Sequence, residues 1–265
     1  MGLFGKWSRR DLLKSSGMAA GALTPIVASS TPASAETITF TGTDKDNLFT
    51  QIGVRPILNA RGTYTILSGS RSLPQVKQAM FEASHYYVQM DEMMEGVGKE
   101  LARLNGCESA MATTGCEAAI VLATVACIAG SNIEKCQALP EVKAKDQVII
   151  PKHSRNPYDV GVRMGGGELI EVETAAELRS RISGRTAMIY VTSDPQEARS
   201  VLPIPAILAI AKEKNIPVFV DAAAEEPMNP NVYMQQGASF VGYSGGKCLR
   251  GPQSSGVLLG KADLI

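Results

Sequence analysis

The 265-residue sequence has few of the residues that build metal centres or disulfide frameworks. It contains only two histidines, His85 and His153, so a Cys/His zinc site is not expected. Its five cysteines are odd in number and none stands in a CxxC pair. A disulfide framework is therefore not indicated, although an oxidising compartment would permit one bridge. The sequence predicts no metal site.

An excess of charge of either sign is also missing. Lys and Arg together number 26 and Asp and Glu together number 26, so the formal net charge is zero. A protein that binds the phosphodiester backbone usually carries a basic surplus, and we therefore expect no nucleic-acid partner. Hydrophobic residues make up 45% and charged residues 20%, which is typical of a packed chain long enough for one large domain.

The first 35 residues are predicted to be a targeting segment. Residues 8–14 read SRRDLLK and resemble a twin-arginine signal, with Leu12 where Phe is commonest. A mildly apolar stretch too short to span a bilayer follows, and residues 33–35 (ASA) supply a small-residue cleavage pattern. We expect a mature chain that begins at Glu36, lies in the periplasm or another extracytoplasmic space, and has no membrane partner. A fortuitous basic and apolar terminus is the alternative.

Strand and helix patterns alternate after a polar arm at 36–55, and residues 56–265 form the predicted large domain. The predicted strands span 109–113, 147–151, 168–173, 186–192, 217–221, 240–244 and 256–260. The predicted helices span 74–84, 90–104, 115–128, 175–182 and 204–214. Strands separated by helices imply an α/β fold with a mostly parallel central sheet and helices on both faces. In such sheets ligands bind beyond the carboxyl ends of the strands.

Methionines at helical spacing mark the helix predicted at 90–104. Met90, Met93 and Met94 recur with Val97, Leu101 and Leu104 on this helix. A ligand or partner surface would explain them, but core packing is the interpretation we favour.

Two predicted strands end in residues suited to a phosphorylated ligand. Thr114, Gly115 and Cys116 follow the strand at 109–113 and open a helix, whose first N–H groups and dipole favour an anion. A structural glycine turn would look the same. Asp221 ends the strand at 217–221, and a carboxylate after three apolar residues needs a cationic or hydrogen-bonding partner. A protonated pyridine nitrogen would serve, as would a ribose, a metal ion or a structural cap.

A third strand end carries a lysine. Gly245 and Gly246 let the backbone fold tightly around Lys247. A desolvated lysine can lose its proton and attack an aldehyde, and Ser244 can donate to a phosphate. A solvated loop lysine is the alternative. The three strand ends in this order favour a site for pyridoxal phosphate (PLP).

The residues around this lysine resemble a known motif. Residues 244–256 (SGGKCLRGPQSSG) look like the cofactor-lysine motif of the selenocysteine synthase-like family, a branch of the fold-type I PLP-dependent enzymes that also includes D-glucosaminate-6-phosphate ammonia-lyase. Residues 220–227 (VDAAAEEP) and 58–63 (LNARGT) are similar to other segments of that branch. The resemblance covers residues 52–265 and implies the aminotransferase-like large domain of fold-type I PLP-dependent transferases.

The resemblance implies a role for each candidate residue. Lys247 would carry PLP as a Schiff base and later move the α-proton of the substrate, while Asp221 would pair with the ring nitrogen and keep it protonated. His153 would stack on the ring, a helix cap or surface histidine being the alternative. The phosphate would be held by Thr114, Gly115, Cys116 and Ser244. Contacts to substrate or phosphate, in this or a neighbouring subunit, would come from Asn59, Arg61 and Arg250.

The sequence departs from the family pattern at its end. It stops at Ile265, soon after the strand predicted at 256–260, whereas the family continues into a smaller C-terminal domain. We therefore expect that domain to be absent or truncated.

The leading hypothesis for function is a PLP-dependent lyase or transferase. It would act on an amino acid or amino-sugar acid by α-proton abstraction followed by β-elimination or replacement. The alternatives are an L-seryl-tRNA(Sec) selenium transferase, for which a neutral exported chain is badly placed, and an exported non-catalytic binding protein that retains the fold. The resemblance also implies a homodimer or larger homo-oligomer with its site at a subunit interface.

Overall fold

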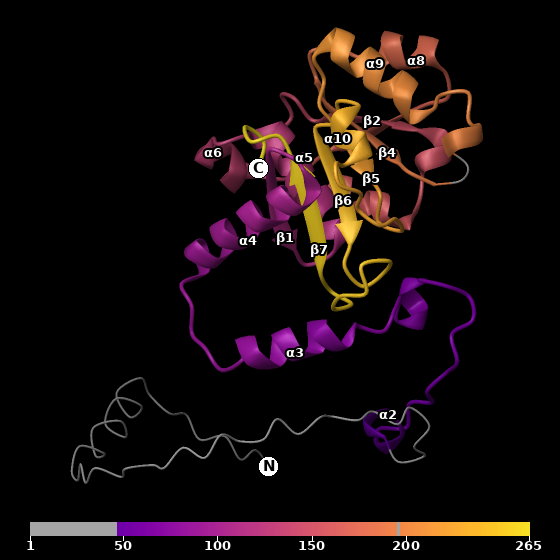
Figure 1. Cartoon of the computed structure of the whole chain (residues 1–265). Helices are drawn as coiled ribbons and strands as arrows, with labels where there is room; N and C mark the ends of the chain where they lie inside the picture. The colour runs from indigo at the N-terminus through magenta and orange to yellow at the C-terminus, as the bar shows by residue number, and fades with distance from the viewer. Residues whose placement is uncertain (1–46, 195–196) are drawn as a thin grey trace, which may run out of the picture. The chain divides into compact units, whose positions relative to one another are not determined.

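The computed structural model describes residues 47–194 and 197–265 (Figure 1). The predicted targeting segment at 1–35 and the first part of the predicted arm, 36–46, lie outside the described residues. A division after Ile57 separates two units of the chain, and each is described by itself.

The described part of the first unit contains one short helix within the predicted arm, α2 (Leu48–Gln51). Asn47 caps this helix, since its side chain accepts hydrogen bonds from the N–H groups of Phe49 and Thr50. The sequence pattern did not predict this single turn.

The second unit, from Leu58 onward, is built on a seven-stranded sheet in the order β1-β7-β6-β5-β4-β2-β3 (Figure 1). Its strands are β1 (Ser109–Thr113), β2 (Gln147–Pro151), β3 (Glu168–Val172), β4 (Thr186–Thr192), β5 (Val218–Asp221), β6 (Phe240–Ser244) and β7 (Gly256–Gly260). Only β7 runs opposite to the other strands, being antiparallel to both of its neighbours, β1 and β6. The predicted mostly parallel α/β sheet is therefore confirmed.

Helices connect most of these strands. They are α3 (Pro74–Ala83), α4 (Met90–Asn105), α5 (Cys116–Ala129), α6 (Ile133–Ala138), α7 (Val160–Met164), α8 (Ala175–Arg181), α9 (Ile204–Lys214) and α10 (Val232–Gln235). Each of the five predicted helices is present, with ends displaced by at most one residue, whereas the short helices α6, α7 and α10 were not predicted. Within the part of the chain that the structure describes, no helix is long and apolar enough to cross a bilayer.

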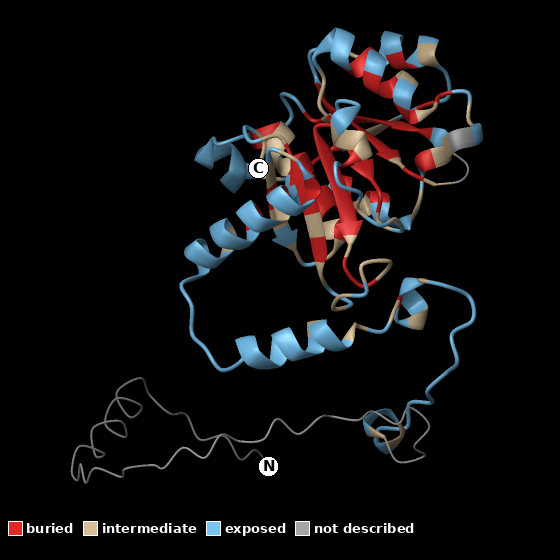
Figure 2. Ribbon diagram, in the orientation of Figure 1, coloured by how far each residue is buried: buried red, intermediate tan, exposed pale blue. Residues whose placement is uncertain are grey.

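The sheet is buried on both faces, as Figure 2 shows. Side chains of a strand alternate between the faces, and β4 illustrates this with every central residue inaccessible to solvent. Ile189 and Val191 pack in the cluster that includes α8 and α9, while Met188 and Tyr190 pack in the cluster that includes α5 and α7. Two apolar layers therefore fix the sheet from both sides, as predicted for a covered parallel sheet.

The prediction that the methionines of α4 pack in the core is wrong for Met90 and Met93, and the half-buried Met94 is the exception. Met90 is 58% exposed, Met93 39% and Val97 38%. The helix instead approaches the sheet through small residues, and a Cβ atom on Gly98 would lie only 2.5 Å from the carbonyl oxygen of Ala110 in β1. Because this close approach is made by the Gly98 face, Met90, Met93 and Val97 point away from the sheet, whereas Met94, one turn before Gly98, is half-buried on the inner face.

Candidate active site

The three predicted strand ends lie at one edge of the sheet. Asp221 ends β5 and is paired with Gly242 of the neighbouring parallel strand β6, which leads into the loop of Lys247. The first residue of α5, Cys116, lies over the same strands, because a Cβ atom on Gly242 would be 2.9 Å from its Sγ atom. The phosphate, carboxylate and lysine candidates are therefore brought together by the fold.

Asp221 is a buried carboxylate, 5% exposed, that is held by three donors. Its Oδ2 atom accepts a hydrogen bond from the Tyr190 hydroxyl at 2.7 Å. Its Oδ1 atom accepts from the N–H of Ala223 at 3.0 Å and from the thiol of Cys116 at 3.4 Å. Among the described residues no cationic side chain forms an ion pair with it. Since an ionised carboxylate offers about four lone-pair positions, roughly one remains open.

The Cys116 thiol is a neutral donor to this carboxylate. Burial raises the pKa of Cys116 well above its usual value, the negative charge of Asp221 raises the pKa further, and the charge of Lys247 lowers it by a smaller amount. The side chain of Cys116 faces Asp221, so the predicted phosphate contact can come only from its backbone N–H.

The Lys247 loop is tied back on itself by backbone hydrogen bonds. The N–H of Gly245 donates to the carbonyl of Ser255, and the N–H of Gly251 donates to the carbonyl of Gly245, both at 2.7 Å. Lys247 is half-buried, and its Nζ atom lies 5.7 Å from the centroid of the Tyr158 ring, within the range of a cation–π contact. The lysine is thus presented toward an aromatic ring at the edge of the site.

The predicted phosphate end is assembled at the start of α5. Gly115 is the N-cap with φ of 121°, and its carbonyl accepts a hydrogen bond from the Thr113 hydroxyl at 2.8 Å. The first-turn N–H groups of a helix have no acceptor within that helix and can bind an anion. Thr114 is exposed, and Ser244 is paired with Gly256 of β7, which packs against Gly115. The predicted phosphate residues therefore share one corner of the sheet.

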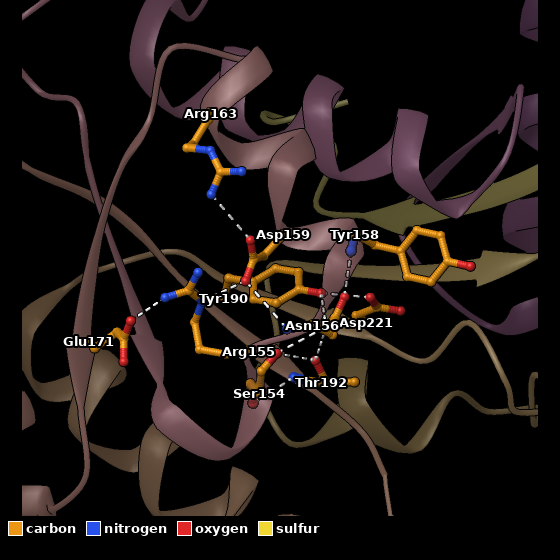
Figure 3. A network of polar contacts seen from close by, with 10 residues as sticks. All are labelled: Ser154, Arg155, Asn156, Tyr158, Asp159, Arg163, Glu171, Tyr190, Thr192 and Asp221. Carbon is orange, nitrogen blue, oxygen red and sulfur yellow. Dashed lines mark hydrogen bonds and ion pairs between the residues drawn. The ribbon is translucent and has the colours of Figure 1, made fainter.

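A polar network that the sequence analysis missed surrounds Asp221 (Figure 3). The Asn156 amide nitrogen lies 2.9 Å from the Ser154 carbonyl, 3.2 Å from the Thr192 hydroxyl and 3.3 Å from the Tyr190 hydroxyl. Its amide oxygen accepts from the N–H of Tyr158 at 2.8 Å. An Asn-Pro pair in the connection that follows β2 is a turn signal that could have pointed to Asn156. Tyr190 gave no such signal, because it looks like a core residue in its strand.

Charged residues hold the outer side of this network, also seen in Figure 3. Arg155 bonds to Asp159 at 2.5 Å and also pairs with Glu171 on β3. Asp159 is 3% exposed and is reached by Arg163 at 3.5 Å. These pairs anchor the turn that carries Asn156 and Tyr158, and thus support the site from outside.

His153 lies after β2, as predicted, but outside the hydrogen-bonded network around Asp221. Its Nε2 atom is buried and has no hydrogen-bond partner among the described residues. Burial lowers the pKa of His153, and the negative charges of Asp194 and Glu197 oppose this shift. The prediction that His153 stacks on a cofactor ring stays a prediction.

Among the described residues, the weaker substrate candidates form no side-chain hydrogen bond or ion pair with Asp221 or Lys247. Asn59 donates to the carbonyl of Gly62 and accepts from the N–H of Arg61, so both lie in one local turn. The Arg61 guanidinium lies 5.0 Å from the ring centroid of Tyr64. Arg250 is exposed, and its backbone N–H donates to the carbonyl of Lys247 at 3.0 Å. Roles for these three residues stay predictions.

Comparison with known proteins agrees with this geometry. The family model described as Cys/Met metabolism PLP-dependent enzyme matches residues 37–262. Over 230 residues the chain is 31% identical to D-glucosaminate-6-phosphate ammonia lyase of Salmonella typhimurium, covering 83% of this chain and 62% of that protein. It is 32% identical over 230 residues to 5'-C-glycyluridine monooxygenase-decarboxylase of a Streptomyces species, covering 82% of this chain and 57% of that protein. The chain thus spans less than two thirds of the length of these relatives.

A more distant relative and a solved structure complete the comparison. L-seryl-tRNA(Sec) selenium transferase of Desulfovibrio desulfuricans is 24% identical over 242 residues, covering 80% of this chain and 49% of that protein. A structure of D-glucosaminate-6-phosphate ammonia-lyase superposes with a TM-score of 0.76 at 28% identity, covering 84% of this chain and 62% of that chain. Both groups named from the lysine motif are therefore among the relatives.

Proposed function

This chain belongs to the PLP-dependent enzymes of Cys/Met metabolism, and from that premise we propose that it is a lyase or transferase for an amino acid or amino-sugar acid. One observation carries the proposal. Asp221 is a buried carboxylate without a cationic partner among the described residues, and it is paired with Gly242 of β6, the strand that leads into the Lys247 loop. PLP supplies the two groups that these side chains lack, a pyridinium for the carboxylate and an aldehyde for the amine.

Each part of the site fits one part of PLP. Asp221 would hold the ring nitrogen and Lys247 the aldehyde carbon. The backbone N–H groups at Gly115 and Cys116 and the hydroxyl of Ser244 would hold the phosphate, because the first turn and the dipole of α5 favour an anion. When bound, the cofactor supplies an electron sink for negative charge at the α-carbon of the substrate.

Lys247 is the residue that moves protons in this proposal. Its amine would take the α-proton and later deliver a proton to the departing group or back to the product. The Tyr158 ring, whose centroid is 5.7 Å from Nζ, would restrict where the side chain can swing between these positions. Loss of the β-substituent gives a lyase, and its replacement gives a transferase.

The substrate class is supported by the relatives and by the charge of the chain. The names of two relatives describe an ammonia lyase of an amino-sugar acid and a decarboxylase of a glycyl compound. The net charge of zero supports a small-molecule substrate rather than a charged tRNA, even though a selenium transferase is among the relatives.

The proposal includes a homodimer or larger homo-oligomer. Large apolar side chains are exposed on and before α4, among them Tyr87 at 107%, Met90 at 58% and Val97 at 38%. Several large exposed apolar side chains in one short segment are a feature of protein–protein interfaces. A second copy of the chain is the partner that would cover it.

The proposal also includes export by the twin-arginine route, which would place the enzyme outside the cytoplasm. It is supported by the sequence SRRDLLK at residues 8–14 and by the small-residue pattern at 33–35. Detection of the mature N-terminus at Glu36 in a periplasmic or culture fraction would test it. Retention of the intact N-terminus in the cytoplasm would contradict it.

The cofactor assignment is tested by adding PLP to the purified chain, to Lys247→Ala and to a control, Lys214→Ala, which changes an exposed lysine on α9. Wild type and the control should develop the visible absorbance of lysine-bound PLP. Borohydride reduction should leave a pyridoxyl group on the peptide of Lys247. Lys247→Ala should stay colourless. A colourless wild-type protein would overturn the proposal and favour the non-catalytic binding alternative.

Activity is tested on the wild-type chain loaded with PLP. Amino acids and amino-sugar acids, with and without a phosphate group, are supplied one at a time, and release of ammonia or of another β-substituent is followed. Turnover of at least one compound, absent in Lys247→Ala, is the expected result. Turnover that Lys247→Ala retains in full would contradict the role given to this lysine.

A further inference from the structure

Tyr190 is placed to control the orientation of the Asp221 carboxylate. It lies in the middle of β4, is inaccessible to solvent, and its ring stacks on Phe219 with centroids 5.8 Å apart and planes 10° from parallel. Its hydroxyl is 2.7 Å from Oδ2 of Asp221. Within the described residues it is the sole side-chain donor to that oxygen, since Cys116 and the N–H of Ala223 both reach Oδ1.

The direction of this hydrogen bond follows from the neighbours of Tyr190. The Asn156 amide oxygen accepts from the backbone N–H of Tyr158, so the amide nitrogen, which can only donate, faces the Tyr190 hydroxyl at 3.3 Å. An ionised carboxylate can only accept. The Tyr190 oxygen therefore accepts a hydrogen bond from the Asn156 amide, and its O–H group donates a hydrogen bond to Asp221.

The hydroxyl keeps that proton. Burial raises the pKa of Tyr190 far above its usual value, and the negative charge of Asp221 adds to the rise. A chain of donors ending on a buried acceptor is strengthened by the low local dielectric.

We propose that Tyr190 is a positioning residue for the PLP ring nitrogen, holding the Asp221 carboxylate so that its remaining lone pair faces the pyridinium. This inference rests on the proposed function. Tyr190 lies two residues before the end of β4. It would act on the ring nitrogen through Asp221 and would not itself contact cofactor or substrate. Removing the hydroxyl frees the carboxylate to rotate in its pocket, so binding through the ring nitrogen weakens while binding through the lysine and the phosphate is unaffected.

The test compares two ligands that differ only at the ring nitrogen. PLP and its 1-deaza analogue, in which carbon replaces that nitrogen, are titrated into wild type, Tyr190→Phe and Tyr243→Phe. The control variant removes the hydroxyl of another buried tyrosine, which accepts from the Asn231 amide at 2.7 Å. Tyr190→Phe should bind PLP about tenfold more weakly, as expected for a lost hydrogen bond to a charged group. It should bind the deaza analogue as wild type does, within about twofold, and Tyr243→Phe should match wild type for both.

Any other pattern of affinities would overturn either the inference or the proposed function. Equal weakening toward both ligands would show that Tyr190 supports only the fold, and unchanged PLP affinity would show that its hydroxyl does not hold Asp221 for the ring; either result overturns the inference. If Tyr190→Phe does not fold, a second variant takes its place. Asn156→Ala removes the amide that donates to the Tyr190 hydroxyl, and it must show the same PLP-selective weakening. Failure of wild type to bind PLP would instead overturn the proposed function itself.

Discussion

The carbonyl oxygen of Gly246 accepts two hydrogen bonds from Ser70, which lies 176 residues earlier in the chain. The backbone N–H of Ser70 donates at 2.8 Å and its hydroxyl at 3.0 Å. The Ser72 hydroxyl donates in the same way to the carbonyl of Gly251 at 2.9 Å. The loop that carries Lys247 is therefore held from outside by a segment that precedes the whole sheet.

Removing these two hydroxyls should loosen the lysine loop. The double variant Ser70→Ala/Ser72→Ala loses one hydrogen bond at each position, and each is expected to contribute about 1 kcal/mol to the local opening free energy. Hydrogen–deuterium exchange of residues 245–251 should become faster, while Ser180→Ala, which removes an exposed hydroxyl bonded to Glu177 on α8, should leave it unchanged. Unchanged exchange in the double variant would mean that the loop is rigid without these bonds.

A methyl group at Gly242 should destabilise the fold. It would lie 2.7 Å from Cζ of Phe219 and 2.9 Å from Sγ of Cys116, so a packed layer has to move. Gly242→Ala should lower the free energy of unfolding by about 1–3 kcal/mol, measured by urea denaturation. Gly184→Ala, where a methyl group would meet nothing within 4 Å, is the matched control. Equal stability of the two variants would contradict the described packing.

The Cys116 thiol should resist alkylation in the folded protein. It is buried, and its pKa is raised first by burial and then by Asp221, so little thiolate forms near neutral pH. Iodoacetamide labelling followed by peptide mass spectrometry should modify the exposed Cys136 much faster. In urea the two rates should converge, and similar rates in the native protein would disprove the placement of Cys116.

His153 should make the apo-protein sensitive to mild acid. Its pKa is lowered in the folded state, so the unfolded chain takes up a proton first as the pH falls below about 6.5. The stability associated with neutral His153 is complete above that pH and is lost as the pH falls through the lower folded value. His153→Gln should flatten this part of the stability curve, whereas His85→Gln, which changes the exposed histidine after α3, should not.

Introducing positive charge on the exposed face of α4 should dissociate the proposed oligomer into monomers. Met93 and Val97 are 39% and 38% exposed and lie about one turn apart on this helix. Met93→Lys/Val97→Lys should sediment as a monomer in analytical ultracentrifugation, with wild type as a dimer or larger species. Lys99→Ala, which changes an exposed side chain on α4 that pairs with Glu95, should keep the wild-type mass. A monomeric wild type would contradict the proposal.

Most of the fold could be predicted because its strands are short apolar runs bounded by Pro, Gly or charged residues. Met188, Ile189 and Tyr190 are buried on both faces of one strand, and a short apolar run between charged or polar residues is typical of a strand in a covered parallel sheet. The short helices such as α7 were missed because five residues give too few turns for a period to be read. The burial of α4 was misjudged because its apolar stripe is strong, while the contact that orients the helix is made by Gly98.

The site was predictable only where the chemistry is carried by residues near one another in sequence. Two parts of the site have local sequence signals. Lys247 follows two glycines, and Asp221 follows an apolar strand. The partnership of Asp221 with Tyr190 and Cys116 joins positions 31 and 105 residues apart, and no local pattern contains it. Asn156 and Tyr158 act through a turn whose position over β4 depends on the pairing of β2 with β4.

The antiparallel strand β7 also sets the time at which a cofactor could first be captured during synthesis. Ser109 and Thr113 of β1 take their partners from Gly260 and Gly256, and β1 is at the edge of the sheet, so it has no other neighbour. At a ribosomal rate of about 5–20 residues per second, β1 emerges many seconds before β7. Until residue 260 has left the ribosomal tunnel, β1 has no partner strand and the anion-binding end of α5 is incomplete, so the nascent chain can capture a cofactor there only after that point.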